Sequence, residues 1–229
     1  LDSLPESITV VGGGYIALEF ASIFTRLGAE TSLIYRGEKL LRGFDEEIRD
    51  FISAEIGRHV DLKLEEDIVS IVNNNNKLHV LLKSGTTISC DTVLSATGRQ
   101  PMTANLGLEN VAVQLSEHGA IVVNDQFQTA EPSIYAIGDV TPGLMLAHRA
   151  TAQAEVVADV IAGRTAAFDK ACIPAVCFTD PEIVSVGLLP SECEDRVETS
   201  EFSFRASGRA LTLDDTEGFV RITARASDH

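Results

Sequence analysis

The stretch VGGGYIALEF, residues 11–20, places the strongest constraint on how this chain can fold. A short apolar run, the end of SLPESITV, comes directly before it, and apolar residues at helical spacing follow it. Gly12, Gly14 and Ala17 lie between the two at the spacing Gly-x-Gly-x-x-Ala. A strand, a glycine-rich turn and a helix in this order are typical of a dinucleotide-binding βαβ unit.

Each of the three small residues has its own physical role in such a turn. Gly12 permits the tight turn, Gly14 lets the backbone approach a pyrophosphate, and Ala17 lets the helix pack closely on the strand. The first N–H groups of the helix and the positive end of its dipole then face the phosphates. The sequence therefore predicts that a dinucleotide binds at the start of this helix.

Two arginines follow the second expected strand, TSLIY at residues 31–35. An NAD site usually carries Asp or Glu there for the ribose hydroxyls, whereas this chain has Tyr35 and then Arg36, with Arg42 further on. The alternative is that both arginines are ordinary solvated loop charges. Because a cation suits a 2′-phosphate, the pattern favours NADP.

Helical and strand patterns alternate in the N-terminal part of the chain. A helix is expected over 15–27, with Gly28 as its stop, and a second helix follows the N-cap residue Asp45 and ends near Gly57. Two helices between short apolar strands predict an α/β fold with a parallel sheet. Three short strands, expected at 68–72, 78–83 and 87–89, then predict an inserted antiparallel meander. A buried strand is expected after it, at 91–96.

Regular structure is expected to be sparser in the rest of the chain. Strands are expected at 121–123 and 133–136, and an alanine-rich helix at 147–162. No helix is expected to close the last set of strands, which lie around 175–178, 184–187, 202–205 and 219–222.

Composition narrows the classes of partner. The 229 residues carry a net charge of −16, which argues against nucleic acid or an anionic membrane as a partner. No apolar run approaches the roughly 18–20 residues of a membrane span, and no secretory signal is visible. Four cysteines are too few for a disulfide scaffold, so a reducing, cytoplasmic setting is expected.

Two further motifs place polar groups at strand ends. SATGRQP, residues 95–101, combines a strand, a glycine and Arg99 in a way that suits a close backbone crossing near a ligand. YAIGDV, residues 135–140, puts Asp139 at the end of a strand, where a carboxylate is well placed for a sugar hydroxyl. The alternative role for Asp139 is to cap a following turn.

The order and spacing of VGGGYIALEF, SATGRQP and YAIGDV resemble those of the FAD-dependent pyridine nucleotide-disulfide oxidoreductases. The resemblance covers nearly the whole chain. It implies a Rossmann-like NAD(P) domain at 1–98, the second part of an FAD domain at 99–168, and the start of an α+β interface domain at 172–229. It also implies FAD and NADP as cofactors and a homodimer when the protein is full length.

The resemblance carries roles onto individual positions. Gly12, Gly14 and Ala17 would cradle the NADP pyrophosphate. Tyr15 would match the tyrosine that lies over the flavin until the nicotinamide displaces it, and Glu19 the glutamate that pairs with a lysine beside the flavin.

The second part of the chain would carry flavin contacts. Gly98 and Arg99 would lie near the cofactors, and Asp139 would bind the ribityl chain of FAD. The residues that would pass the pyrimidine side of the flavin, with backbone N–H groups that stabilise the reduced ring, are Met145, Leu146 and Ala147.

The two halves of the chain resemble different members of the family. Residues 35–51 look like glutathione reductase, including both arginines, whereas 143–150 and 204–222 look more like lipoamide dehydrogenase. Because residues 35–51 should touch the cofactor directly, we favour an NADPH-dependent, glutathione reductase-like enzyme. The alternatives are a lipoamide dehydrogenase-like or mercuric reductase-like member, and so a small-molecule or a lipoyl disulfide is the expected substrate.

The resemblance also implies that parts of the catalytic machinery lie outside this sequence. The redox-active cysteine pair would precede Leu1, and a catalytic His with its Glu would follow His229. We therefore expect a fragment with no disulfide reductase activity of its own. Two rival interpretations are a non-catalytic nucleotide-binding module and a simple Rossmann dehydrogenase; the latter leaves Asp139 unexplained.

Cys172 and Cys177 have the Cys-x4-Cys spacing of the family's redox pair, but they do not follow a glycine-rich turn. In a regular strand, side chains five positions apart point to opposite faces, about 16 Å from each other. We expect these cysteines to be structural. The remaining cysteines and the histidines have no spacing typical of metal ligands, so no metal site is expected.

Overall fold

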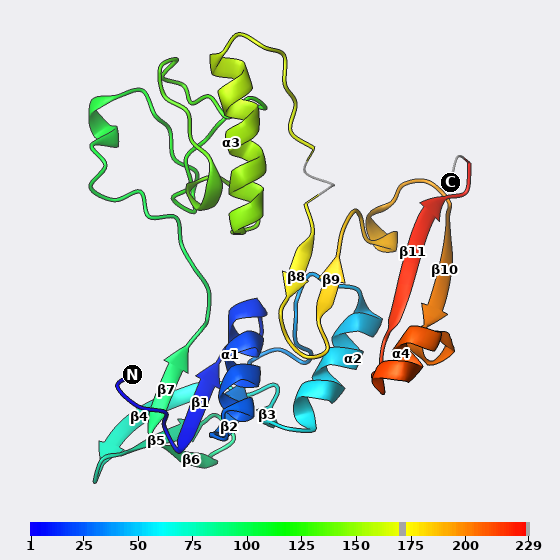
Figure 1. Cartoon of the computed structure of the whole chain (residues 1–229). Coiled ribbons are helices and arrows are strands. Elements are labelled where there is room, and N and C mark those ends of the chain that lie inside the picture. The colour runs from blue at the N-terminus through cyan, green and yellow to red at the C-terminus, as the bar shows by residue number, and fades with distance from the viewer. Residues whose placement is uncertain (170–172, 228–229) are drawn as a thin grey trace. The chain divides into compact units, whose positions relative to one another are not determined.

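The computed structural model describes residues 1–169 and 173–227, which form two compact units. The first unit combines Leu1–Thr97 with the segment from Pro174 onward, and the second unit runs from Gly98 to Ile173 (Figure 1). Within the described residues, no helix is long and apolar enough to cross a membrane.

A four-stranded parallel sheet forms the centre of the first unit. Its strand order is β3 (Asp61–Lys63), β2 (Glu30–Ile34), β1 (Ser7–Val11) and β7 (Thr92–Ser95). β1 is therefore an inner strand, and four of its five residues are buried. The prediction of an α/β fold with a parallel sheet is confirmed. β3 was not predicted, because three residues with one apolar side chain carry no periodic pattern.

Two helices complete the alternating βαβ pattern. α1 (Tyr15–Arg26) buries Ala17, Leu18 and Ala21, and α2 (Glu46–Gly57) buries Ile52 and Ile56. These side chains belong to one apolar cluster with β1 and β2. As predicted, the side chain of Asp45 caps α2 by accepting a hydrogen bond from the Glu47 N–H at 3.1 Å.

The predicted meander is present as β4 (Ile68–Asn74), β5 (Lys77–Leu82) and β6 (Thr87–Cys90), all antiparallel. The asparagine run lengthens β4, and a two-residue turn follows with φ of 51° at Asn75 and 64° at Asn76. Asparagine tolerates this left-handed backbone better than most residues, which explains why it suits the turn. A small separate apolar cluster lies beneath the meander.

The C-terminal segment adds two antiparallel pairs to the first unit. β8 (Ala175–Cys177) pairs with β9 (Ile183–Ser185), and β10 (Val197–Ser203) pairs with β11 (Phe219–Arg225). The strand expected at 202–205 was wrong in its bounds, because a 3-10 turn occupies 204–206.

A short helix that was not predicted lies among these last strands. α4 (Gly208–Leu213) lies in the connection between β10 and β11, and the Ser207 hydroxyl caps it by accepting from the Ala210 N–H. The helix is only six residues long, too short for an apolar period to show.

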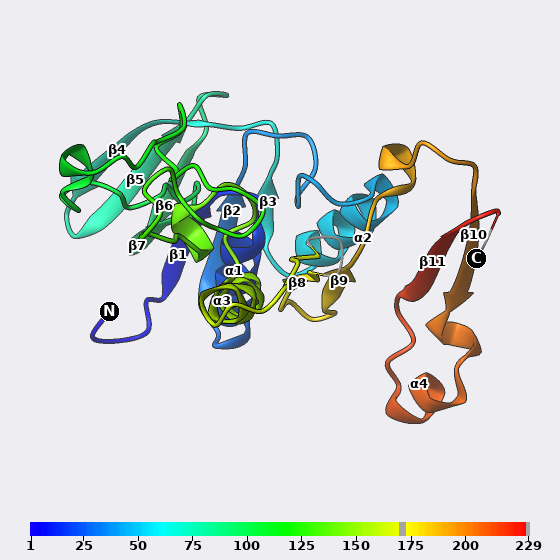
Figure 2. The ribbon, with the colours of Figure 1, turned by 90° about the horizontal axis from the view of Figure 1, so that it is seen from above.

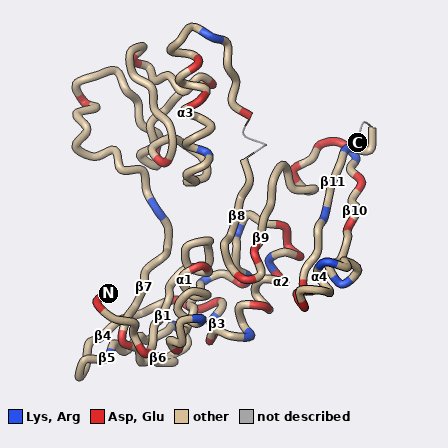
Figure 3. Tube along the Cα trace, viewed as in Figure 1, with Lys and Arg blue, Asp and Glu red and all other residues tan. Residues whose placement is uncertain are grey.

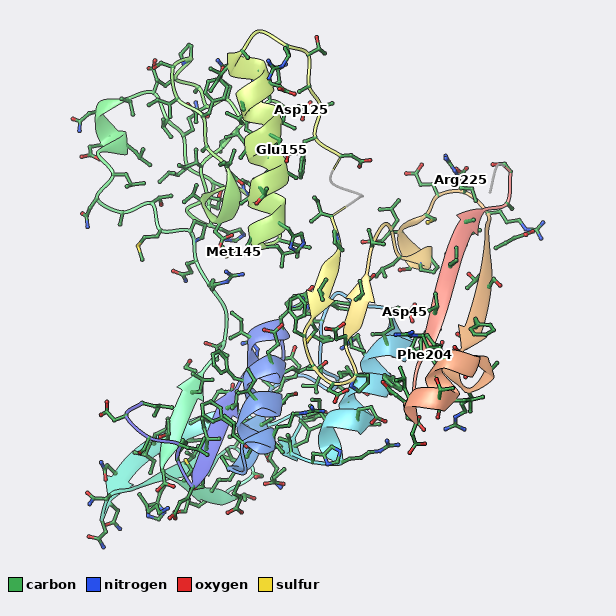
Figure 4. The ribbon with its side chains drawn as sticks, in the orientation of Figure 1. Asp45, Asp125, Met145, Glu155, Phe204 and Arg225 are labelled. Atoms are coloured by element: carbon green, nitrogen blue, oxygen red, sulfur yellow. The ribbon has the colours of Figure 1, made fainter. Side chains whose placement is uncertain are left out.

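The β10–β11 pair stands on the α2 side of the first unit in both views (Figures 1 and 2). Phe219 packs edge-on against Phe51 of α2. The guanidinium carbon of Arg221 lies 5.1 Å from the centre of the Phe219 ring. Arg221 also donates to Asp45 and Glu201, and it contacts Glu47. Figure 4 labels Asp45 at the start of α2, near Phe204.

Apart from two short 3-10 turns, α3 (Ala147–Ile161) is the only helix in the described part of the second unit. The strands expected at 121–123 and 133–136 were wrong: this region has only two isolated pairings, Leu115 with Ile121 and Gln128 with Tyr135. A run of apolar residues becomes a strand only where a partner continues the ladder, and here the pairing stops after one residue.

Candidate functional site

The glycine turn joins the carboxyl end of β1 to α1. Gly12 has φ of 140°, and its N–H donates to the Ile34 carbonyl at 2.9 Å. A Cβ atom added to Gly12 would lie 2.3 Å from the Ala96 carbonyl oxygen. Gly12 is therefore required by the fold itself, because both the backbone angle and the neighbouring strand exclude a side chain.

Gly14 differs from Gly12 in that open space surrounds it. A Cβ atom there would meet nothing within 4 Å, and the residue caps α1 with an extended backbone and no side-chain hydrogen bond. The first turn of α1 also contains no acidic residue. An open approach to a helix N-terminus that has no side-chain cap fits a pyrophosphate group.

Ala17 is fully buried, as the fingerprint predicts. Its Cβ lies 3.2 Å from where a Cβ on Gly12 would be. The two small residues thus let the start of α1 approach β1 closely.

The two predicted arginines lie on the loop after β2, and both are exposed. Within the described residues, neither Arg36 nor Arg42 forms an ion pair, whereas Lys39 between them pairs with Glu46 and Asp50. The chain has a net charge of −16, so carboxylates that could pair with an arginine are plentiful (Figure 3). Two unpaired guanidinium groups in such a chain suit an anionic ligand.

The arginine loop is tied to the glycine turn. Leu41 is buried, and its N–H donates to the Gly13 carbonyl at 2.8 Å. The loop backbone is further held by α2, because Ser53 accepts from the Leu40 N–H and Arg49 donates to the Leu40 carbonyl. The structure therefore brings the loop that carries the predicted 2′-phosphate ligands and the predicted pyrophosphate turn together.

Tyr15 and Glu19, predicted to lie beside the flavin, face the strand β8 region of the first unit. The Tyr15 ring packs edge-on against Phe44 at 5.7 Å, and burial, with a smaller effect of Cys177, raises its pKa. The Glu19 carboxylate accepts a hydrogen bond from the Phe178 N–H at 3.0 Å. Sequence reasoning missed this backbone partner, which lies 159 residues away along the chain.

In the second unit, Arg99 and Asp139 form an ion pair at 3.0 Å. Arg99 also contacts the carbonyl of Met145, which Figure 4 labels near the start of α3. Gly98, with φ of 135°, precedes the arginine. The structure thus gathers Arg99, predicted to lie near the cofactors, with Asp139 and Met145, which were predicted separately as flavin contacts.

Two residues that sequence reasoning missed hold the turn that carries Asp139. Gln153 is buried and accepts from the Gly138 N–H at 2.7 Å, whereas its own Nε2 has no hydrogen-bond partner among the residues that the structure describes. Arg149 is 8% exposed and donates to the Leu144 and Pro142 carbonyls and to Thr141. Burial lowers the Arg149 pKa. The sequence signal that could have identified them is their spacing, because two large polar residues lie one turn apart in an alanine-rich helix.

The segment 145–147 leads into α3. Leu146 is the N-cap residue of α3 and makes no side-chain hydrogen bond to the helix, which begins at Ala147. The Leu146 N–H already donates to the Leu144 carbonyl at 3.1 Å, so the prediction that this amide faces a flavin requires that bond to be exchanged.

Of the two cysteines at the Cys-x4-Cys spacing, the structure describes only Cys177. Cys172 lies outside the described residues, and Cys177 is fully buried in β8, where burial raises its pKa to about 12. A thiol with so high a pKa is a poor nucleophile at neutral pH. Among the described residues, no group of His, Cys, Asp and Glu could hold a metal ion.

Comparison with known protein families identifies the family of this chain. The family model described as pyridine nucleotide-disulphide oxidoreductase matches residues 1–154, and the dimerisation domain of the same family matches 173–229. The chain belongs to this family. Its members are FAD-dependent and bind NAD(P), and the resemblance seen in the sequence is confirmed.

Similar proteins carry two kinds of name. The chain is 39% identical to dihydrolipoyl dehydrogenase of Pseudomonas aeruginosa, covering 99% of this chain and 50% of that protein. It is 38% identical to glutathione reductase of Burkholderia cepacia, covering 98% of this chain and 51% of that protein. The chain therefore spans about half the length of the relatives it matches.

Solved structures agree with the fold. LpdA from Mycobacterium tuberculosis superposes with a TM-score of 0.92 at 28% identity, covering 99% of this chain and 50% of that one. The flavoprotein disulfide reductase RclA from Escherichia coli gives 0.90 at 29% identity, covering 99% and 54%. The roles of individual site residues stay predictions.

Proposed function

We propose that this chain provides the pyridine nucleotide site and part of the FAD site of a disulfide reductase, with NADPH as the hydride donor. The observation that carries the proposal is that Arg36 and Arg42, which form no ion pair within the described residues, lie on a loop hydrogen-bonded to an open glycine turn. The division into an NAD(P) domain at 1–98, part of an FAD domain at 99–168 and an interface domain at 172–229 belongs to this proposal. So does a homodimer of the full-length protein.

The preference for NADPH follows from charge. Each guanidinium–phosphate bond contributes roughly 1.5–3 kcal/mol, so two of them discriminate NADPH from NADH by at least an order of magnitude. NADH offers only ribose hydroxyls at this place, and the chain has no carboxylate directly after β2 to receive them.

The residues of the chain then have distinct tasks. The backbone at Gly14 and the start of α1 bind the pyrophosphate, and Arg36 and Arg42 bind the 2′-phosphate. Asp139, oriented by Arg99, accepts a hydrogen bond from a sugar-like hydroxyl of the flavin chain. Two-electron transfer between a nicotinamide and a disulfide is the chemistry that FAD supplies when bound.

Calorimetric titration of the chain with NADPH and with NADH tests the proposal. We expect NADPH to bind at least tenfold more tightly, and Arg36→Ala and Arg42→Ala each to weaken NADPH at least fivefold with little effect on NADH. Arg58→Ala is the matched control, because Arg58 is an exposed arginine of the same unit that pairs with Glu55 on α2. Equal affinity of the unaltered chain for the two cofactors would disprove the NADP assignment.

Glutathione disulfide is the substrate we favour, because residues 35–51 look like glutathione reductase. A lipoyl substrate is the second candidate, supported by the resemblance of 143–150 and 204–222 to lipoamide dehydrogenase. Assays of the full-length protein with each disulfide, using NADPH and NADH, separate the two. Nucleotide binding with no disulfide reduction by the full-length protein would instead identify a binding module.

A further inference from the structure

The side chain of Tyr35 occupies a narrow space between the glycine turn and the arginine loop. A Cβ atom on Gly13 would lie 2.6 Å from each of Cγ, Cδ1 and Cδ2 of Tyr35. Equal distances to three consecutive ring atoms place that point over the face of the ring. The backbone of Gly13 therefore lies on the Tyr35 ring, and no larger residue fits there without a shift.

The hydroxyl end of the same ring meets a second glycine. A Cβ atom on Gly37 would lie 2.5 Å from Cε1, 2.8 Å from Cζ and 3.0 Å from the hydroxyl oxygen of Tyr35. Arg36 lies between Tyr35 and Gly37 in the chain. The contact of the ring with Gly37 therefore restricts the backbone that carries the Arg36 guanidinium.

The main chain of Tyr35 is held independently of its ring. Its N–H donates to the Lys63 carbonyl at 2.9 Å, and its carbonyl accepts from the Glu66 N–H at 3.2 Å. The ring also packs against the main apolar cluster of the first unit. Tyr35 thus has one defined position, from which it can orient its neighbours.

Gly13 connects both ends of the arginine loop to the turn. Near Arg36 the connection is the Tyr35 ring, and near Arg42 it is the hydrogen bond from Leu41 to the Gly13 carbonyl. Leu41 adopts φ of 50°, a left-handed backbone that a leucine holds only where its surroundings require it. The loop is therefore prearranged against the turn at both ends.

We propose that Tyr35 is a positioning residue for cofactor specificity: its ring, seated on Gly13 and Gly37, holds the loop of Arg36 and Arg42 where a dinucleotide's 2′-phosphate arrives. The inference rests on the proposed function, because it deepens the preference for NADPH. Tyr35 itself makes no contact with the phosphate. Its contribution is to lower the conformational entropy that the two arginines lose on binding.

Four variants test this role by titration with NADPH and NADH. Tyr35→Phe keeps the ring and should leave the affinity ratio within twofold of the original. Tyr35→Leu removes the planar ring, and Gly37→Ala places a methyl group where the ring lies; each should reduce the ratio at least fivefold by weakening NADPH. Gly57→Ala is the control, because its Cβ would make only an ordinary contact of 3.8 Å with Leu62.

A change in the affinity ratio separates positioning from general stability, since a loosened fold would weaken both cofactors alike. Circular dichroism confirms folding, and Gly37→Ala carries the comparison if Tyr35→Leu does not fold. An unchanged ratio in the folded variants would overturn the inference, as would a loss in Tyr35→Phe equal to that in Tyr35→Leu, which would mean direct contact by the hydroxyl. If the unaltered chain shows no preference for NADPH, the proposed function fails first and the inference with it.

Discussion

A Cβ atom on Gly12 would lie 2.3 Å from the carbonyl oxygen of Ala96, whereas one on Gly14, two residues along the same turn, would meet nothing within 4 Å. The two fingerprint glycines therefore have different physical reasons to be glycine. Gly12 is needed for the sheet to form, because β1 and the chain after β7 meet there. Gly14 is needed only if a ligand approaches.

Alanine at these two positions should separate folding from binding. We expect Gly12→Ala to lower the free energy of unfolding by about 3 kcal/mol or more, since it combines a steric overlap with a strained backbone. Gly14→Ala should stay within about 1 kcal/mol and weaken NADPH binding at least tenfold. Urea unfolding and calorimetric titration measure the two effects. A Gly14→Ala protein that binds normally would show that the phosphate does not approach there.

The ion-pair cluster at Arg221 should contribute to stability. The Arg221 side chain is 17% exposed, and it faces Asp45, Glu47 and Glu201. Burial opposes its charge, but hydrogen bonds to Glu201 and Asp45, together with the negative charges of Glu47 and Asp45, outweigh that effect and raise its pKa. We expect Arg221→Ala to cost about 1–3 kcal/mol in urea unfolding, because three carboxylates lose a shared partner.

Arg209→Ala is the control for the Arg221 variant. Arg209 is exposed on α4, and we expect its substitution to change the unfolding free energy by less than about 0.5 kcal/mol. Equal effects of the two substitutions would show that the cluster at Arg221 adds nothing to stability.

Burial of the Cys177 thiol should appear in the pH dependence of stability. Its pKa is raised from an ordinary 9.0 to about 12, so the folded state keeps the thiol neutral where the unfolded state ionises. The stabilisation is complete below pH 9 and is lost as pH rises from there toward 12, by up to about 1.4 kcal/mol per pH unit.

Cys177→Val removes this ionisation while keeping an apolar side chain. Its unfolding free energy should therefore fall less steeply above pH 9 than that of the unaltered chain. Tyr15 still contributes in both proteins, because burial raises its pKa as well. Identical alkaline slopes in the two proteins would contradict a strongly raised thiol pKa.

Arg149 should be essential to the turn that carries Asp139. Its guanidinium donates to three backbone carbonyls and to the Thr141 hydroxyl from a largely buried position. We expect Arg149→Met to cost about 2–4 kcal/mol, since buried acceptors lose their donor. Hydrogen exchange at the Gly138 N–H should accelerate at the same time.

The matched substitution is Arg164→Met, which removes an exposed arginine paired with Asp159. We expect it to change stability by less than about 1 kcal/mol and to leave exchange at Gly138 unaltered. Fast exchange in both variants would mean that the turn opens independently of Arg149.

Local patterns in the sequence were enough for much of the fold. Helices α1 and α2 and the three-stranded meander follow from periodicity and turn residues, which act over a few positions. β3 could not be predicted, because its pairing with β2 is what makes three residues a strand. The absence of strands at 121–123 and 133–136 has the same cause, since a continuing partner is lacking there.

The candidate site likewise has residues that a sequence motif identifies and contacts that no motif identifies. Gly12, Gly14, Arg36 and Arg42 could be singled out because a motif places them at set spacings. The hydrogen bond from Phe178 to Glu19 and the hold of Arg149 and Gln153 on the Asp139 turn could not. These contacts depend on which surfaces meet after folding, and a spacing rule carries no such information.

By itself, the sequence determined the α/β class, the dinucleotide turn and the charge placed beside it, because each depends on residues close together in the chain. Only the tertiary structure decided that Gly12 serves the fold while Gly14 leaves space for a ligand. It also decided that Tyr35 and Leu41 tie the arginine loop to Gly13. The physical reason is that van der Waals overlap and hydrogen bonding act between atoms that folding brings together, whatever their distance along the chain.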